Sequence, residues 1–156
     1  MKNQYALCFL ILVFLQSCGG AGLYEQNKEI PATGWAVDSI ATFKFSVEDT
    51  TQKYNIFYNV RNQVAYPYYN LYVTFYLYND KDSLLASNLH EMNLANPTTG
   101  EPYGSGLGDV RDHQFLGLPN CRFKQKGTYT FKIKQYMRQN PLKNIEAIGI
   151  KVAEAE

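Results

Sequence analysis

The sequence predicts an all-β fold, namely a single antiparallel β-sandwich domain of immunoglobulin-like or jelly-roll type. Five segments alternate apolar and polar residues with a period of two, and they are rich in β-branched and aromatic residues. This pattern is typical of strands that bury one face in an antiparallel sheet. Polar connectors, some bearing Gly or Pro, separate the segments, as they do in small all-β domains.

The chain begins with a short apolar run that ends in a cysteine. Residues 6–15 are all apolar, which suits a signal-peptide core and is too short to span a bilayer. Leu15-Gln16-Ser17-Cys18 closes the run and resembles the bacterial lipobox. The resemblance implies a lipoprotein signal peptide over 1–17 and lipidation of Cys18 with fatty acyl chains such as palmitate. An ordinary secretory signal with an incidental cysteine is the alternative.

The rest of the chain divides into a tether and a domain. Residues 18–33 are small, polar and Pro-bearing, which predicts a lipidated tether, and 34–156 are predicted to form the sandwich. The predicted strands are 43–47, 54–60, 71–77, 129–133 and 148–152. The predicted turns between them are 49–51, 61–62, 65–67, 79–82 and 125–127.

Three stretches do not follow the strand rhythm. Residues 84–94 and 135–138 are the best candidates for a helical turn or two. Residues 96–118 contain seven glycines and prolines and are predicted to form a long loop. Loops of this length in compact domains are often functional.

Charge and cysteine content exclude several classes of protein. The chain has 15 basic and 14 acidic residues, and Lys2 leaves with the signal peptide, so the mature protein is close to neutral. We therefore expect no nucleic-acid partner and no polybasic membrane patch, and membrane attachment through the N-terminal lipid alone. Of the three cysteines, Cys8 lies in the signal and Cys18 carries the lipid, which leaves Cys121 without an intramolecular disulfide partner. Cys121 is then a buried small hydrophobe or a free thiol.

No motif makes a positive case for catalysis, a metal or a cofactor. The glycine-rich segment 103–109 lacks the Lys-Ser/Thr of a phosphate loop. Asp109, Asp112 and His113 have no known ligand spacing, and the two aspartates have the alternative of pairing with Arg111 and Arg122. We therefore predict no catalytic residues, no metal site, no cofactor and no enzyme activity.

Tyrosines supply the best candidate for a binding surface. The chain has thirteen, and alternation places Tyr72, Tyr76 and Tyr78 on one strand face. Exposed aromatic residues anchor protein interfaces and stack on sugar rings, although packing is the plainer explanation. We predict that these three tyrosines, with Asp109 of the glycine-rich segment, contact a partner.

Several segments match one family in its order along nearly the whole mature chain. They are Gly34-Trp35, Asp49-Thr50-Thr51-Gln52, Arg61-Asn62, Tyr66-Pro67-Tyr68, Gly104-Ser105-Gly106-Leu107-Gly108-Asp109, Gly127-Thr128-Tyr129-Thr130-Phe131 and Pro141-Leu142. With the lipobox, they make the chain resemble the gliding-motility lipoprotein GldH family of the Bacteroidota. Tyr103 departs from the tryptophan that is frequent in the family at this position.

The resemblance implies an outer-membrane lipoprotein that serves surface gliding as a non-enzymatic accessory of the gliding and type IX secretion apparatus. It implies protein components of that machinery as partners and no catalytic residue. Gly19 after the lipidated cysteine favours the outer membrane, and the lack of a neighbouring acidic cluster favours the periplasmic face. The alternative function is a carbohydrate-binding outer-membrane lipoprotein.

Overall fold

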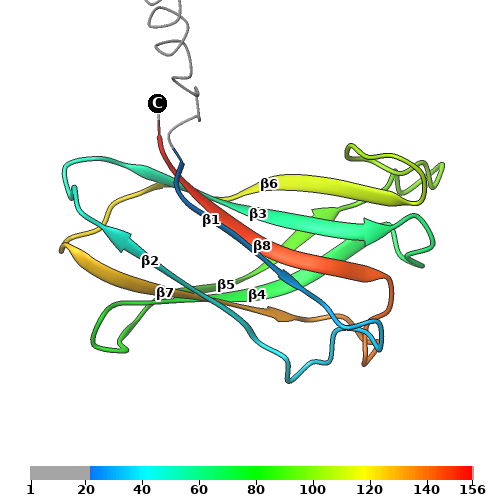
Figure 1. The fold of residues 1–156 in the computed structure, drawn as a ribbon, viewed down its shortest axis with the longest axis horizontal. Coiled ribbons are helices and arrows are strands. Elements are labelled where there is room, and N and C mark those ends of the chain that lie inside the picture. The colour runs from blue at the N-terminus through cyan, green and yellow to red at the C-terminus, as the bar shows by residue number, and fades with distance from the viewer. Residues whose placement is uncertain (1–21, 156) are drawn as a thin grey trace, which may run out of the picture.

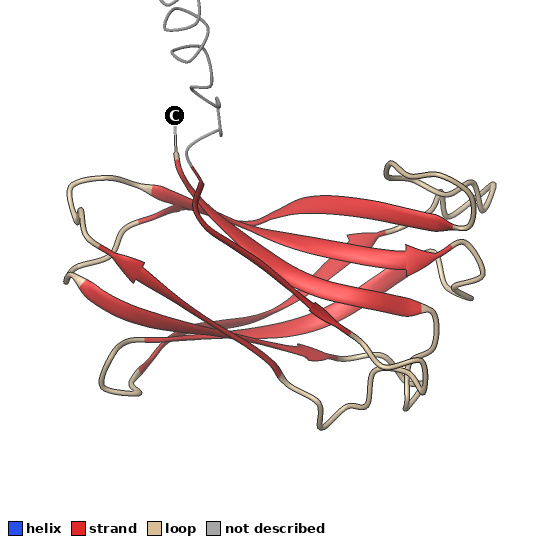
Figure 2. Ribbon diagram, viewed as in Figure 1, coloured by secondary structure: helices blue, strands red, loops and turns tan. Residues whose placement is uncertain are grey.

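The computed structural model describes residues 22–155, and this part of the chain is built from strands and loops without a helix (Figures 1 and 2). Eight strands form two antiparallel four-stranded sheets that pack face to face, which confirms the predicted all-β sandwich. The strands are β1 Gly22–Glu29, β2 Ala41–Val47, β3 Tyr54–Gln63, β4 Asn70–Tyr78, β5 Leu84–Asn93, β6 Val110–Cys121, β7 Gly127–Gln135 and β8 Ile145–Glu154.

The strand order decides between the two sandwich types that the sequence left open. Sheet A has the order β1-β8-β3-β6, and sheet B has the order β2-β7-β4-β5. Eight antiparallel strands in these orders form a jelly roll. Most paired strands, such as β1 and β8, are far apart in sequence, so most contacts within the sheets are long-range.

The core lies between the sheets and is made of the residues that the alternation predicted to face inward. Phe43, Ile56, Val73, Phe131 and Ile150 are all almost completely buried, each from a different strand. Phe75 and Phe131 stack with ring centroids 5.4 Å apart. All five predicted strands are therefore confirmed, with their apolar faces in the core. Burial of each large apolar side chain contributes about 1.5–3 kcal/mol to the stability of the fold.

Three predicted features are wrong, and each falls at the margin of the sandwich. Residues 84–94 are not helical but form the edge strand β5 with Leu94 just beyond it. Its side chains are mostly exposed on both faces, so the period of two is absent from the sequence. Residues 136–138 follow β7 without a helical turn. The second half of the predicted loop 96–118 is β6, the edge strand of sheet A, and only 94–109 form a loop.

The N-terminal segment also differs from the prediction. Gly22–Glu29 is not a tether, because it forms β1 and pairs with β8 along the edge of sheet A. Its residues 25–29 are polar and exposed on both faces of an edge strand, so the sequence gave no sign of burial. The predicted signal peptide 1–17, Cys18 and the first residues of the predicted tether lie outside the described residues.

Candidate functional site

The three predicted tyrosines share the outer face of sheet B. Tyr72, Tyr76 and Tyr78 alternate along β4 with buried residues, and all three are half-buried. The neighbouring strand β7 places Lys132 beside them, with its Nζ 4.7 Å from the centroid of the Tyr78 ring. A cation over an aromatic face is attractive, so this side chain covers part of the tyrosine surface.

Asp109 does not join these tyrosines. It lies just before β6 of sheet A, whereas the tyrosines belong to sheet B. Its side chain is exposed, and its carbonyl oxygen accepts a hydrogen bond from the Val64 amide at 2.7 Å. The structure therefore separates the predicted contact residues into a tyrosine face and a loop on the other sheet.

Asp112 and His113 do not form an acid–base pair. They are neighbours on β6, so one side chain points outward and the other into the sandwich. Asp112 forms an ion pair with Arg61 of β3 at 2.8 Å, and both side chains are close to half exposed. Nε2 of His113 lies 2.9 Å from Oδ1 of buried Asn62. The predicted alternative pairings of aspartates with Arg111 and Arg122 are replaced by the pair with Arg61.

The glycines of the glycine-rich segment allow the chain to fold back on β6. Gly104 and Gly106 have φ angles of +80° and +155°. A side chain at Gly104 would lie 2.6 Å from the Asp112 carbonyl oxygen. The amide of Ser105 between them donates to that carbonyl at 3.0 Å, and the Asp112 amide donates back at 2.7 Å. These glycines therefore set backbone geometry, as glycines do where the chain needs positive φ.

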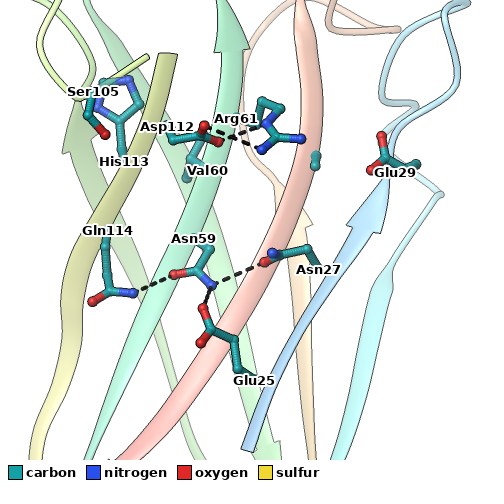
Figure 3. A pocket seen from close by; sticks show the side chains of 11 residues that line it. Glu25, Asn27, Glu29, Asn59, Val60, Arg61, Ser105, Asp112, His113 and Gln114 are labelled. Atoms are coloured by element: carbon teal, nitrogen blue, oxygen red, sulfur yellow. Dashed lines mark hydrogen bonds and ion pairs between the residues drawn. The ribbon is translucent and has the colours of Figure 1, made fainter. Parts of the chain in front are cut away.

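A polar hollow lies on the outer face of sheet A, and sequence reasoning did not find it (Figure 3). Its volume is about 290 Å³. Antiparallel register places residues of four strands in two rows across the sheet. One row is Glu29, Ala147, Arg61 and Asp112, and the next is Asn27, Gly149, Asn59 and Gln114.

Amide side chains join the strands across this hollow. Nδ2 of Asn59 donates to Oε1 of Glu25 at 2.8 Å and to Oδ1 of Asn27 at 3.1 Å. Nε2 of Gln114 donates to Oδ1 of Asn59 at 3.0 Å. The resulting ladder runs from β1 to β6, as the dashed lines of Figure 3 indicate.

The ladder passes over Gly149 because this residue has no side chain. A Cβ at position 149 would collide with Oδ1 of Asn27 and lie 2.5 Å from the Gln26 carbonyl oxygen. Ala147, the next outward residue of β8, is also small. The hollow therefore forms where two small residues of β8, Ala147 and Gly149, lie between the polar side chains of the neighbouring strands β1 and β3. The polar alternation of β3 was visible in the sequence, but the register that aligns it with β1 and β6 was not.

Of the two histidines, His113 is buried and His90 is half-buried. Burial is the main cause that lowers the pKa of His90 and that of His113, and Arg111 lowers the pKa of His113 further while Asp112 opposes this. Burial also raises the pKa of the Cys121 thiol, which is half-buried. A thiol with a raised pKa is a poor nucleophile at neutral pH.

The described residues, 22–155, contain neither a metal-binding cluster nor a membrane-spanning helix. No group of three or more His, Cys, Asp or Glu side chains in this range is arranged to hold a metal ion. In the same range, no helix has the length and apolar character needed to cross a bilayer.

The fold and its surfaces define a single-domain jelly-roll protein whose polar and aromatic side chains gather on the outer faces of both sheets. The sequence model described as GldH lipoprotein matches residues 22–152, which include nearly all of the sandwich. This chain belongs to the GldH lipoprotein family. The resemblance found from its motifs is thereby confirmed.

Two relatives from the Bacteroidota match over almost their whole length. The "Gliding motility lipoprotein GldH" of Flavobacterium johnsoniae is 30% identical, with 95% of this chain and 90% of the relative aligned. The "Gliding motility lipoprotein GldH homolog" of Christiangramia forsetii is 28% identical, with 100% and 99% aligned. The family is thus one of lipoproteins named for gliding motility.

Solved structures give weaker matches. A chain from the structure of infectious bursal disease virus Gx strain aligns with a TM-score of 0.41 and 11% identity, covering 87% of this chain and 30% of that chain. The VP2 subviral particle of the same virus gives a TM-score of 0.37 and 12% identity, with 87% and 31% covered. This chain thus spans less than a third of each viral chain, and the similarity supports no functional argument.

Proposed function

We propose that this protein is a lipid-anchored, non-enzymatic accessory component of bacterial gliding motility that associates with the type IX secretion and gliding apparatus. The observation that carries the proposal is membership of the GldH lipoprotein family over residues 22–152. The association with the apparatus is tested by crosslinking the tagged, lipidated protein in native cells and identifying what is recovered. Enrichment of gliding or type IX secretion components supports it, and their absence from the recovered proteins contradicts it.

A non-enzymatic role agrees with how the polar side chains are used. Asp112 is paired with Arg61, His113 with Asn62 and Asn59 with three neighbours. These contacts hold side chains within the sheet rather than aim a base at a nucleophile, which catalysis by proton transfer requires. Measurable turnover that is lost on Asp112→Asn would overturn this part of the proposal.

The tyrosine face is the proposed docking surface for the machinery. Tyr72, Tyr76 and Tyr78 are half-buried on one sheet face, where aromatic side chains can supply most of an interface's binding energy. We expect Tyr76→Ser with Tyr78→Ser to abolish gliding at normal protein level and thermal stability. Tyr103→Ser, at a tyrosine that is 43% exposed in the loop between β5 and β6, is the matched control. Normal gliding by the double tyrosine variant would exclude this face.

Asp109 is proposed as a separate, smaller contact on the other sheet. It is exposed, and only its backbone carbonyl is engaged by Val64 among the described contacts. Asp109→Asn preserves that carbonyl and removes the charge. We expect weaker recovery of the partner with an unchanged melting temperature, and unchanged recovery would remove Asp109 from the interface.

Lipidation of Cys18 is proposed to hold the domain at the outer membrane, facing the periplasm. Stable anchoring takes more than one acyl chain, and tethering makes a modest docking surface effective by raising local concentration. We expect Cys18→Ala to leave an unprocessed precursor without lipid and to abolish gliding. Digestion by protease added to intact cells would contradict the periplasmic orientation.

The polar hollow favours a second candidate function, which is binding of a carbohydrate. Asn59 holds Gln114 and Glu25 in place through the ladder, and Gln114, Arg61, Glu25 and Glu29 surround the open space with an amide and charged groups. Such groups suit the hydroxyls of a saccharide. Saturable binding of a polysaccharide that is lost on Asn59→Ala and kept on Thr130→Ala would support this function. Failure to bind any cell-envelope glycan would exclude it.

A further inference from the structure

Strand β1 begins at the end of the sandwich where β8 finishes. Gly22 pairs with Ala153 at the end of β8, and Tyr54 at the start of β3 pairs with Cys121 at the end of β6. The β2–β3, β4–β5 and β6–β7 loops lie at this same end, which we call the anchor end (Figure 1). The β1–β2, β3–β4, β5–β6 and β7–β8 loops lie at the other end.

The position of β1 limits how far the domain can stand from its lipid. Only four peptide steps separate Cys18 from Gly22, where the predicted tether would have allowed sixteen residues. Four steps of extended chain reach about 14 Å at most. The inference rests on the proposed lipidation of Cys18, because that lipid then holds the anchor end within this distance of the membrane.

The β6–β7 loop gives the anchor end a local positive charge. Arg122, Lys124 and Lys126 are exposed, and residues 122–126 contain no acidic side chain. Phe123 between them is buried against Phe45 and Tyr129, which holds the loop against the core. The acidic residues of the same end belong to the other loops and to β8, and they are Glu48, Asp49, Asp80, Asp82 and Glu154. Of these, Asp49 interacts electrostatically with Lys126.

Apolar side chains lie next to these cations. A hollow of about 520 Å³ beside the loop is lined by Leu77, Leu85, Leu118 and Phe123, and by Arg122 and Lys124 as well. Leu85 and its neighbour Leu84 are 50% and 53% exposed. Cations beside exposed leucines are the combination with which proteins bind the interface of an anionic bilayer.

In contrast to the expectation from net charge that the lipid alone attaches the protein, we propose that the anchor end also docks on the membrane surface through the β6–β7 loop and the start of β5. Arg122, Lys124 and Lys126 bind anionic phospholipid headgroups, and Leu84 and Leu85 contact the boundary of the acyl region. The short link to Cys18 keeps this surface in place once the lipid is inserted. The docked domain presents both outer sheet faces sideways and the opposite loops away from the membrane, where proteins can reach them.

The test uses the full lipidated protein in vesicles. With Cys121 replaced by Ser, a dye is attached to Gln125→Cys in the β6–β7 loop or to Thr98→Cys at the opposite end, and quenching by headgroup-labelled lipid is measured. Vesicles contain phosphatidylcholine alone or with phosphatidylglycerol. The charge-reversal variant is Arg122→Glu, Lys124→Glu and Lys126→Glu, and its matched control is Lys44→Glu, Lys134→Glu and Arg138→Glu.

If the anchor end docks, the dye at position 125 should be strongly quenched only in vesicles that contain phosphatidylglycerol. This quenching should be unchanged in the control variant and reduced in the charge-reversal variant. The ratio of docked to undocked protein should fall by more than roughly 100-fold, because loss of three cations at an anionic surface accounts for about that factor and the three new carboxylates are also repelled. Quenching at position 125 that is the same with and without phosphatidylglycerol, and the same in the charge-reversal variant as in the wild type, would overturn the docking. Flotation of the protein with vesicles is scored separately, and its loss would instead overturn the lipid anchor.

Discussion

The hydroxyl of Tyr58 lies 3.0 Å from Nδ1 of His90, and this hydrogen bond joins the two sheets of the sandwich. Tyr58 belongs to β3 of sheet A, and His90 belongs to the edge strand β5 of sheet B. The Tyr58 ring is almost completely buried, which raises the pKa of its hydroxyl far above the ordinary value of 10.0. The contact therefore fixes an otherwise exposed edge strand to the core.

Removal of the Tyr58 hydroxyl should lower the free energy of unfolding by a measurable amount. Tyr58→Phe keeps the ring and deletes the bond to His90, so we expect a loss of about 0.5–1.5 kcal/mol in the free energy of unfolding. Urea unfolding measures this. Tyr136→Phe, at a tyrosine that is 62% exposed, is the control and should change little. Equal stability of Tyr58→Phe and wild type would mean that the hydroxyl contributes nothing.

A side chain at Gly117 should displace the same ring. A Cβ at this position would lie 2.5 Å from Cε2 of Tyr58. We expect Gly117→Ala to cost about 1–3 kcal/mol, as overpacking usually does. In a Tyr58→Leu background the cost should be smaller, because no ring edge remains to be displaced. Additive effects of the two changes would contradict direct contact.

Acid should destabilise the protein before its carboxylates titrate. Burial holds the pKa of His90 and of His113 below the ordinary value of 6.5 in the folded protein. The unfolded chain therefore binds more protons as the pH falls below 6.5, and the stability present above this pH declines toward the folded pKa values. Unfolding free energies measured between neutral pH and pH 5 should show this decline.

The matched variant for this experiment is His90→Gln with His113→Gln. It should unfold with a smaller pH dependence over the same range, since neither glutamine titrates. Stability that rises toward pH 5 in the wild-type protein would reverse the sign and refute the assignment.

The hydrogen-bond ladder in the polar hollow should depend on the absence of a side chain at Gly149. Gly149→Ala introduces a Cβ that collides with Asn27 and crowds the Gln26 carbonyl. We expect a loss of about 1–3 kcal/mol in unfolding free energy. Asn27→Ala in the same chain should restore part of it by removing the colliding amide. No rescue would place the strain in the backbone of β1 instead.

The ion pair between Arg61 and Asp112 should contribute little to stability in spite of its good geometry. Both side chains are nearly half exposed, at 46% and 49%, so solvent screens the pair. Asp112→Asn should shift the unfolding free energy by no more than about 1 kcal/mol. Thermal melts at low and high salt measure this, and a larger loss would assign the pair a structural role.

Three of the four edge strands, β1, β5 and β6, are where sequence-based prediction failed, whereas the edge strand β2 buries one face and was predicted. A central strand such as β4 buries one face completely, so Val73 and Phe75 alternate with polar neighbours and the pattern is visible. β5 and β1 lie at sheet edges and leave most side chains in solvent, so neither carries that alternation. The same reasoning placed the three tyrosines of β4 correctly on one face, but it gave no sign of the hollow on sheet A.

The sequence by itself determined the all-β class, the inward faces of the four central strands and of β2, and the resemblance to the GldH lipoprotein family. These properties are local, because alternation and short motifs need no partner strand. Only the tertiary structure decided the jelly-roll order, the ladder from Asn27 to Gln114 and the bond between Tyr58 and His90. Each depends on register between strands that are far apart in the chain, and register is fixed by packing of the whole core.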